Sequence, residues 1–557
     1  MMVLSQAVDS NENPPRLELG DIVVIDKASD CDSGVHDAAF AVVFRVEGTT
    51  GDAWYHLLLM TGLTAVATDQ HLFPVDSGDL LLDQEVSCPS TIDLTTYRVY
   101  QANHLVRVGS IAVQCLEKIS RRMIGAMVER HHDHFERDVS FQSGSTPIPV
   151  SGKVIDAHEK RLMVEASLDG WLTAGRFNDD FETGLSKFLG VKHLLTVNSG
   201  SSANLVAFTA LMSSKLGKQA IRKGDEVLTV AAGFPTTVNP IIQAGCIPVF
   251  LDVDPKTYNI DTSDIESAVT SKTRAVMLAH TLGNPFNLDV IRGLCEKYGL
   301  WLVEDCCDAL GTEYRGQKVG TFGDVATLSF YPAHHITMGE GGAVFTNSGK
   351  LKPILESMRD WGRDCFCRPG IDNTCGKRFD WQLGELPAGY DHKYVYSHAG
   401  YNLKISDMQA ACAAGQLHKL HDFIRKRKDN FRFLYECFSD CEDYLILPQE
   451  TPYSDPSWFG FPVTLRSDRV SRRQLLKFLE ARKIGTRLIF AGNLTRQPYM
   501  KDHSYRVHGS LSNTDTIMNN AFWLGVYPAL NTQQLTFVAE SVKEFLQAEN
   551  LPFIENS

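Results

Sequence analysis

The chain has 557 residues, of which 43% are hydrophobic and 22% are charged. This composition can fill several packed cores and excludes a disordered or collagen-like protein. The formal net charge is -13 and no basic tract occurs, so we expect no nucleic-acid partner. Residues 1–120 carry 17 Asp and Glu against 6 Lys and Arg, which leaves a net charge of only -2 for the other 437 residues. This break in charge predicts a separate N-terminal module.

The compartment follows from the first residues and from the cysteines. The chain lacks a basic start followed by an apolar run, and it contains no stretch of about 18 apolar residues. We therefore expect a non-exported protein without a membrane span. Thirteen cysteines, an odd number, indicate reduced thiols or metal ligands rather than a disulfide framework. The expected location is the cytoplasm.

Residues 1–110 are expected to form a small β-rich module. Short strand-like runs (DIVVID, AAFAVVFRV, AWYHLLLM and YRVYQ) are separated by Gly, Asp and Ser. They predict an antiparallel barrel or sandwich that weakly resembles the PemK type. Its acidity argues against RNA cleavage, so we expect a regulatory or packing role. A helix over 113–135 and a Gly-, Ser- and Pro-rich connection form the linker, residues 111–153.

Strands alternate with helices from Val191 onward. The apolar runs HLLTV, DEVLTVA, IPVFLDV, RAVMLAH and LWLVED indicate a mostly parallel sheet sandwiched by helices. We assign this α/β domain to residues 154–400. Beyond Gly400 a long helical stretch precedes the strand FGFPVTL and the helix SRRQLLKFLEARK, which predicts a smaller C-terminal α/β domain, residues 401–557.

The segment NSGSSANL lies between a predicted strand and a predicted helix. Its backbone N–H groups and hydroxyls would converge at a helix N-terminus, where phosphate binds well. Gly200 and Ser201 are therefore candidates for a phosphate cradle. An ordinary helix cap has the same sequence pattern, so the segment alone does not decide.

The strand end LWLVEDCCDALG carries three acids: Glu304, Asp305 and Asp308. The carboxyl edge of a parallel sheet is the usual place for a ligand. A buried carboxylate there requires a cationic partner, and a protonated pyridine nitrogen would be one. The alternative is a carboxylate that only caps a helix.

Five segments occur in the order of a known family: NSGSSANL, AAGFPTT, VEDCCDALG, SFYPAHHITMGEGGAV and GYNLKISDMQAA. Together they resemble the sugar aminotransferase group (DegT/DnrJ/StrS) of fold type I pyridoxal phosphate (PLP) enzymes. The likeness extends from roughly Ser120 to the C-terminus. It implies the fold type I PLP-dependent transferase architecture and a homodimer.

The resemblance also assigns residues to the cofactor. Three of them would hold its phosphate: Gly200, Ser201 and Ser329. Phe234 would stack on the pyridine ring, Asp305 would pair with the ring nitrogen, and Asp308 would partner the ring hydroxyl. Lys404 lies where a neighbouring subunit usually contributes a phosphate contact.

The chain departs from the family pattern at the Schiff-base position. Relatives that transaminate have Lys directly after the small residue of this loop, where this chain has His334 followed by His335. Imidazole cannot form the covalent link, so the resemblance implies noncovalent pyridoxamine 5'-phosphate (PMP) with His334 as a base. Without the surrounding motif, two adjacent histidines would indicate only a polar loop.

A second departure is a set of four cysteines. Cys307, Cys365, Cys367 and Cys375 have the spacing C-x57-C-x-C-x7-C. Four thiolates suit zinc or an iron–sulfur cluster. Cys306 is an alternative to Cys307, because neighbours at a strand end point in opposite directions. The spacing is similar to that of the family's subgroup with His in place of Lys, which carries one [2Fe-2S] cluster.

The resemblance therefore implies a 3-dehydrase of a nucleotide-linked 4-keto-6-deoxyhexose, typified by CDP-4-dehydro-6-deoxyglucose. The PMP amine would condense with the C4 ketone, and His334 would remove a proton from the cofactor methylene so that the C3 hydroxyl leaves. A separate NAD(P)H-dependent flavin and iron–sulfur reductase would supply two electrons through the cluster. The resulting 4-keto-3,6-dideoxy sugar would serve O-antigen and lipopolysaccharide synthesis. CDP and dTDP sugars are not separated by this reasoning.

Two other functions stay open. One is a PLP-dependent aminotransferase of the same keto-sugars, anchored by a different lysine. The other is a non-enzymatic regulator whose cysteines hold structural zinc. The segments GWLTAGRF and GTRLIFAGNLTRQPY are candidates to line the nucleotide-sugar cleft.

Overall fold

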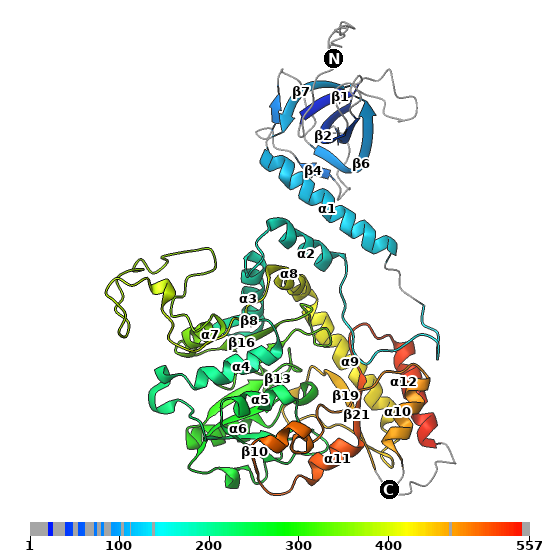
Figure 1. The fold of residues 1–557 in the computed structure, drawn as a ribbon. Coiled ribbons are helices and arrows are strands. Elements are labelled where there is room, and N and C mark those ends of the chain that lie inside the picture. The colour runs from blue at the N-terminus through cyan, green and yellow to red at the C-terminus, as the bar shows by residue number, and fades with distance from the viewer. Residues whose placement is uncertain are drawn as a thin grey trace. The chain divides into compact units, whose positions relative to one another are not determined.

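The computed structural model describes seven strands between Asp21 and Ile111, a helix at Val113–Phe135, and residues 140–466 and 470–547. The contacts between Cα atoms group the chain into two compact units, residues 1–137 and 138–557 (Figure 1). Helix α1 (Val113–Phe135) lies in the first of these units. The finer boundaries at 110, 153 and 400 stay predictions. None of the helices in the described ranges has the length and apolar character needed to cross a membrane.

The first unit contains an antiparallel sheet of seven strands in the order β4-β6-β3-β2-β1-β7-β5. Its strands are β1 (Asp21–Ile25), β2 (Ala39–Glu47), β3 (Trp54–Thr61), β4 (Leu72–Pro74), β5 (Leu80–Leu82), β6 (Thr91–Gln101) and β7 (Leu105–Ile111). The strands follow the apolar runs expected from the sequence. Closure into a barrel and the likeness to PemK stay predictions.

The second unit is built on an eight-stranded sheet in the order β20-β10-β9-β11-β12-β15-β16-β8. Its strands are β8 (His193–Val197), β9 (Glu226–Val230), β10 (Ile247–Leu251), β11 (Thr273–Ala279), β12 (Trp301–Asp305), β15 (Val325–Ser329), β16 (Gly342–Thr346) and β20 (Arg506–Val507). The pairs from β20 to β15 are parallel, whereas β16 is antiparallel to both of its neighbours. The sheet is therefore mixed, and the expected mostly parallel arrangement holds except at β16.

Helices cover both faces of this sheet (Figure 1). They are α2 (Ala157–Asp169), α3 (Arg176–Leu189), α4 (Gly200–Leu211), α5 (Pro235–Gln243), α6 (Leu288–Tyr298), α7 (Leu351–Arg359) and α8 (Asp407–Gln416). Successive strand residues alternate between two cores: Leu302 packs with helices α3, α6 and α8, and Val303 packs with α4 and α7. This alternation is the two-residue period of a strand buried on both sides.

The C-terminal part of the second unit has its own core. Its helices are α9 (Leu420–Phe438), α10 (Arg472–Ala481), α11 (Ser512–Asn520) and α12 (Thr532–Gln547), and its sheet contains β17 (Leu445–Ile446), β19 (Gly460–Leu465) and β21 (Ala521–Gly525). A smaller sheet joins β13 (Glu313–Tyr314), β14 (Gln317–Lys318) and β18 (Ser454–Asp455). Buried side chains of α9, α10, α12, β19 and β21 form one cluster. A separate C-terminal α/β domain stays a prediction.

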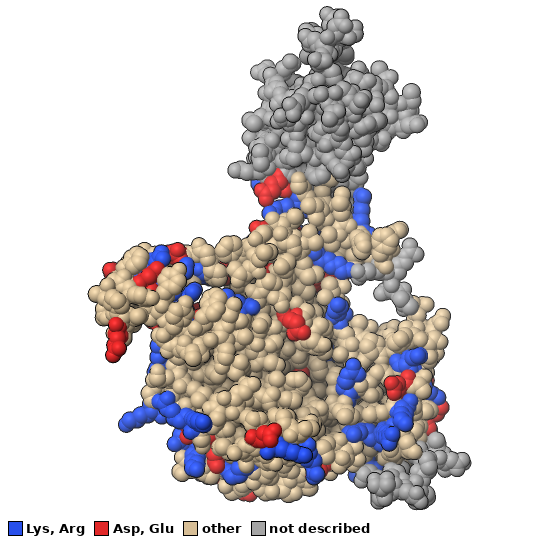
Figure 2. All heavy atoms as spheres, in the orientation of Figure 1, with Lys and Arg blue, Asp and Glu red and all other residues tan. Residues whose placement is uncertain are grey.

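Charged side chains on the visible face of the second unit lie in small groups of both signs (Figure 2). The ion pairs of this unit include Arg496 with Asp515 and Arg482 with Glu544, each with a nitrogen–oxygen distance of 2.5 Å. Exposed pairs of this kind contribute about 0–1 kcal/mol each. The stability of the unit therefore depends mainly on its apolar cores.

Candidate active site

The carboxyl edge of the large sheet opens into a cavity of about 730 Å³. Its wall contains six of the seven residues assigned to the cofactor: Gly200, Ser201, Phe234, Asp305, Asp308 and Ser329. His334 and Cys307 also line it. The strands β12 and β15 end here, and α4 begins here, so the topology gathers residues that are far apart in sequence.

One end of the cavity has the features of a phosphate site. The Ser199 hydroxyl caps α4 by accepting the Ser202 N–H at 3.0 Å. A Cβ atom on Gly200 would lie 2.5 Å from Cβ of Ser329, so only glycine allows this close approach. The first N–H groups of a 12-residue helix therefore face the cavity beside two serines, Ser201 and Ser329.

Asp305 is a buried carboxylate in the cavity wall. Its Oδ2 accepts hydrogen bonds from Asn204 Nδ2 at 2.8 Å and from Thr237 Oγ1 at 2.7 Å. Its Oδ1 accepts the Cys307 N–H at 3.1 Å. These donors are all neutral, and within residues 140–466 and 470–547 Asp305 forms no ion pair. A protonated pyridine nitrogen would supply the missing positive charge, so this wall fits a PLP or PMP ring.

Phe234 presents a flat apolar surface to the same cavity. It precedes helix α5, and its side chain is 50% exposed, which is unusual for a phenylalanine in a packed fold. Phe490 contacts it edge to face, with 6.2 Å between the ring centroids. A planar ring bound between Phe234 and Asp305 would cover this exposed surface.

The two adjacent histidines have different surroundings. His335 is buried, and its Nε2 lies 2.9 Å from the hydroxyl and 3.0 Å from the carbonyl of Ser457. His334 lines the cavity, and its Nδ1 lies 3.4 Å from Oδ1 of Asp308. Of the pair, only His334 is placed to act on a bound ligand.

The electrostatics of the site keep His334 neutral. Burial and the charge of Arg427 lower the pKa of His334 to about 4. Burial and the charge of Asp305 raise the pKa of Asp308 to about 8. At neutral pH the Asp308 carboxyl therefore holds a proton while the imidazole beside it is free to accept one.

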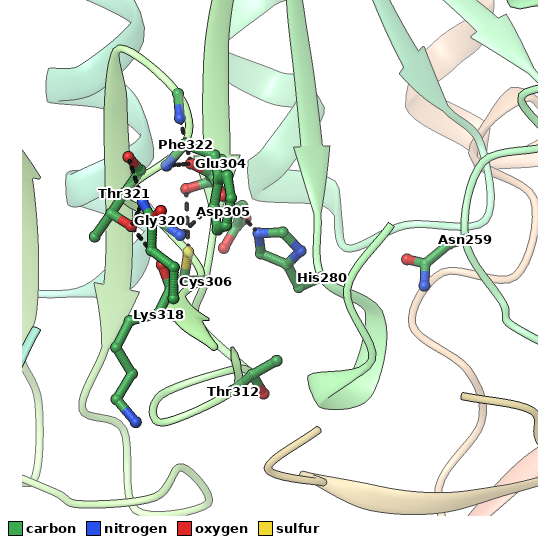
Figure 3. A network of polar contacts seen from close by, with 12 residues as sticks. Asn259, His280, Glu304, Asp305, Cys306, Thr312, Lys318, Gly320, Thr321 and Phe322 are labelled. Atoms are coloured by element: carbon green, nitrogen blue, oxygen red, sulfur yellow. Dashed lines mark hydrogen bonds and ion pairs between the residues drawn. The ribbon is translucent and has the colours of Figure 1, made fainter. Parts of the chain in front are cut away.

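Behind the cavity wall lies a hydrogen-bonded network centred on Glu304 (Figure 3). Its carboxylate accepts N–H groups from Gly320 at 2.8 Å, Phe322 at 2.9 Å and Gly323, and His280 Nε2 lies 3.0 Å away. In the part of the chain with described side chains, His280, Glu304 and Cys306 are the one trio of potential ligands within 4.8 Å. Both Glu304 oxygens already accept N–H groups, so the trio is better explained as a structural network than as a metal centre.

The four cysteines of the expected cluster are placed on two segments. Cys307 lines the cavity, and its Sγ lies 3.1 Å from where a Cβ on Gly200 would be. Cys306 is buried on the other side, beside Gly320, as expected for neighbours at a strand end. Cys365, Cys367 and Cys375 lie in the loop between α7 and α8, which extends from the body of the unit (Figure 1).

The structure does not itself assemble a four-sulfur site. Cys365 Sγ accepts the Cys367 N–H at 3.5 Å, but no three of the four sulfurs lie within 4.8 Å of one another in the described coordinates of these residues. Burial raises the pKa of the Cys307 thiol well above its usual range. The chemistry of the four thiols suits iron, since all of them are free. To bind one [2Fe-2S] cluster, their sulfurs would have to lie closer together than they do in this structure. The ligand set stays a prediction.

Lys404 lies outside the cavity wall. Its Nζ is 2.8 Å from the Asn402 amide oxygen, 3.6 Å from the Asp360 carboxylate and 3.4 Å from the centre of the Trp361 ring. Burial lowers the pKa of Lys404. Its expected contact with a neighbouring subunit stays a prediction.

Several cavity residues were not expected from the sequence. Asn204 and Thr237 orient Asp305, and Phe459 packs on His334 with 5.1 Å between ring centroids. Asn204 was visible only as part of NSGSSANL, and Phe459 carried no signal. Arg487, from the segment GTRLIFAGNLTRQPY, lines the cavity together with Leu488 and Phe490, whereas no residue of GWLTAGRF does.

The chain is similar to several known proteins. The chain is 62% identical over 426 residues to the lipopolysaccharide biosynthesis protein RfbH of Salmonella typhimurium, covering 76% of this chain and 98% of RfbH. It is 50% identical over 436 residues to the dTDP-4-dehydro-2,6-dideoxy-D-glucose 3-dehydratase of Saccharopolyspora spinosa, covering 78% of this chain and 94% of that protein. Among solved structures, a mutant GDP-4-keto-6-deoxymannose-3-dehydratase (ColD) with bound GDP-perosamine superposes with a TM-score of 0.64.

The ColD match has 29% sequence identity and covers 71% of this chain and 99% of that one. It shows the α/β fold of the fold type I PLP-dependent enzymes. The sequence profile of the DegT/DnrJ/EryC1/StrS aminotransferase family matches residues 153–543 and leaves the N-terminal β-rich unit outside it. On the strength of this match and of the identity to RfbH, the chain belongs to the DegT/DnrJ/EryC1/StrS aminotransferase family.

Proposed function

We propose that the chain is a PMP-dependent 3-dehydrase that removes the C3 oxygen of a nucleotide-linked 4-keto-6-deoxyhexose in lipopolysaccharide O-antigen synthesis. The observation that carries the proposal is His334, which stands at the Schiff-base position and lines the cavity beside Asp308. The likeness to RfbH and to two 3-dehydratases supports the same reaction class. We assign CDP-4-dehydro-6-deoxyglucose as the substrate.

Different residues along the cavity bind the cofactor, keep its ring protonated and transfer protons. When bound, PMP supplies an amine for the C4 ketone and an electron-withdrawing ring. Gly200, Ser201 and Ser329 hold its phosphate, and Asp305 keeps the ring nitrogen protonated. His334 accepts a proton through the nitrogen that does not face Asp308. The imidazolium so formed can return that proton to the C3 hydroxyl, which leaves as water.

The aminotransferase alternative predicts a different outcome in a simple experiment. An enzyme with a lysine anchor yields a covalent cofactor adduct after PLP binding and borohydride reduction, which mass spectrometry detects as a mass increase of the protein. We expect no such adduct here, together with PMP-dependent consumption of CDP-4-dehydro-6-deoxyglucose. An adduct on a lysine, or amination of the sugar at C4, would replace the dehydrase assignment by the aminotransferase one.

Loss of water alone does not give the 3-deoxy sugar. The dehydrated product must also be reduced by two electrons. We propose that an NAD(P)H-dependent flavin and iron–sulfur reductase supplies them, and that Cys307, Cys365, Cys367 and Cys375 hold the [2Fe-2S] cluster that receives them. The cysteine spacing supports this assignment. A homodimer, with Lys404 reaching the neighbouring subunit, belongs to the same proposal.

Anaerobically prepared protein is expected to contain about two iron atoms per chain and to absorb visible light. Replacing Cys365 with Ser should remove most of both signals, because it deletes one of four ligands. Replacing Cys441, which is buried in the C-terminal core, should change neither signal. Zinc in place of iron, or an unchanged iron content in the Cys365 variant, would contradict the cluster assignment.

Arg487 is expected to bind the substrate diphosphate. Among the described residues, Arg487 is the one Lys or Arg in the cavity wall. The acids in the same wall are Asp305, Asp308 and Glu340. Its Nη1 donates to the adjacent Thr486 carbonyl at 2.8 Å, and the described residues give it no ion pair, so its other donors are available. Losing a charge-assisted hydrogen bond of about 1.5–3 kcal/mol should raise KM about tenfold to hundredfold in Arg487→Gln, with little change in kcat.

The matched control is Arg496→Gln, because Arg496 is an exposed arginine of the same segment that pairs with Asp515 outside the cavity. Its KM should stay within about twofold. Equal KM values for the two variants would remove Arg487 from the substrate site.

A further inference from the structure

Arg427 is a buried cation that joins two segments of the active site. It lies on α9 and has no exposed surface. Its Nη1 donates to the carbonyls of Trp458 at 3.4 Å and Phe459 at 3.1 Å. Its Nη2 donates to the carbonyls of Ala333 at 3.5 Å and His334 at 3.2 Å. One guanidinium therefore bonds two segments: the loop that carries Ala333 and His334, and the residues Trp458 and Phe459 directly before strand β19.

A buried arginine without a hydrogen-bonded carboxylate is costly, since buried charges are normally paired. In the described ranges Arg427 makes no ion pair within 4 Å, and its printed hydrogen-bond acceptors are all backbone carbonyl oxygens. Burial lowers the pKa of Arg427 to about 9, which leaves it charged at neutral pH. Its planar fork can reach four carbonyls at once, which an ammonium group cannot do.

The same two segments set the position of the His334 ring. The Phe459 ring packs against it with 5.1 Å between centroids, and the Arg427 guanidinium lies 5.8 Å from the Phe459 ring centre. The next residue, His335, is held by Ser457. His334 is thus restrained through its own carbonyl, through its ring and through its neighbour.

We propose that Arg427 is a positioning residue for the dehydration: it holds the backbone of Ala333 and His334 against Trp458 and Phe459 so that the imidazole stays aimed into the cavity. Arg427 is not a catalytic residue, because it is absent from the cavity wall. The inference rests on the proposed function for its kinetic consequence, but its structural part is independent of any activity.

The test compares Arg427→Lys with Arg472→Lys. Arg472 is a matched control because its Nη1 also donates to two carbonyls, Met518 at 2.6 Å and Ala521 at 3.0 Å, and it lies outside the cavity wall. Lysine keeps the charge of Arg427 but not the four-carbonyl fork. We expect kcat to fall about 100-fold in Arg427→Lys, the size of effect that a misplaced catalytic group has. KM and the dissociation constant of PMP should stay within about threefold, and Arg472→Lys should match the wild type.

A second readout needs no activity. Hydrogen–deuterium exchange of the segment 330–337 should become faster in Arg427→Lys and stay unchanged in Arg472→Lys. An unchanged exchange rate or an unchanged kcat in an active preparation would overturn the inference. A loss of PMP binding in step with kcat, or a comparable effect of Arg472→Lys, would show a merely structural role and would also overturn it. If the wild-type protein lacks dehydrase activity, the proposed function fails, while the exchange measurement still decides whether Arg427 holds the loop.

Discussion

Replacement of His334 with Asn is expected to lower kcat for 3-dehydration by about 10³-fold, because a general base contributes about 10²–10⁴-fold and the amide of Asn is not basic. The Asn side chain is smaller than that of His, so it fits between Asp308 and Phe459 without displacing them. PMP affinity should therefore change little. Single-turnover assays of sugar consumption, together with equilibrium dialysis of PMP, separate the two quantities.

The adjacent residue supplies the control. His335 bonds Ser457 and does not line the cavity, so His335→Gln should lower kcat less than about tenfold while it lowers the melting temperature. If His334→Asn keeps wild-type turnover, or if both variants lose the same activity, His334 is not the base. Retained iron in His334→Asn would show that a loss of turnover does not come from a loss of the cluster.

Replacement of Asp305 with Asn should lower kcat by about 10²–10³-fold, the scale found when one preorganised electrostatic contact to a reacting group is lost. The Asn oxygen can still accept from Asn204 and Thr237, which both bond Oδ2 in the wild type. The variant therefore keeps its fold and loses the negative charge that stabilises a protonated ring nitrogen. Bound PLP should also show a changed absorption spectrum, since the protonation of its ring changes.

Thr237→Val is the companion variant. It removes one hydrogen bond to Asp305 but leaves the charge in place, so we expect a loss of no more than about tenfold in kcat. A smaller effect of Asp305→Asn than of Thr237→Val would contradict the assignment of Asp305 to the ring nitrogen.

Much of the fold could be predicted from local patterns. Each expected strand between His193 and Asp305 is present, because a strand that is buried between helices on both faces consists of a nearly continuous run of apolar residues. The direction of β16 could not be predicted, since the run GAVFT has the same apolar pattern in either direction and is fixed by pairing with β15 and β8. Closure of the N-terminal sheet into a barrel stays a prediction.

The residues of the candidate site could likewise be predicted only in part from the sequence. Residues at strand ends and at the start of α4, such as Ser329, Asp305 and Gly200, could be predicted to meet because parallel strands share one carboxyl edge. Arg427 could not, because it lies in a helical segment rich in Lys and Arg where no neighbour marks it as buried. The pattern of a solvated helix and that of a helix with one buried cation are the same over a few turns.

The amino-acid sequence by itself determined which chemical groups are present: an imidazole where an amine would form a Schiff base, four thiols in a distinctive spacing, and acids at a strand end. These are properties of single residues and of short segments, so no contact is needed to identify them. Only the tertiary structure decided that His334 lines the cavity while His335 bonds Ser457, and that Arg427 joins their loop to the C-terminal part. Such choices depend on burial and on contacts between segments about 100 residues apart, which local patterns do not encode.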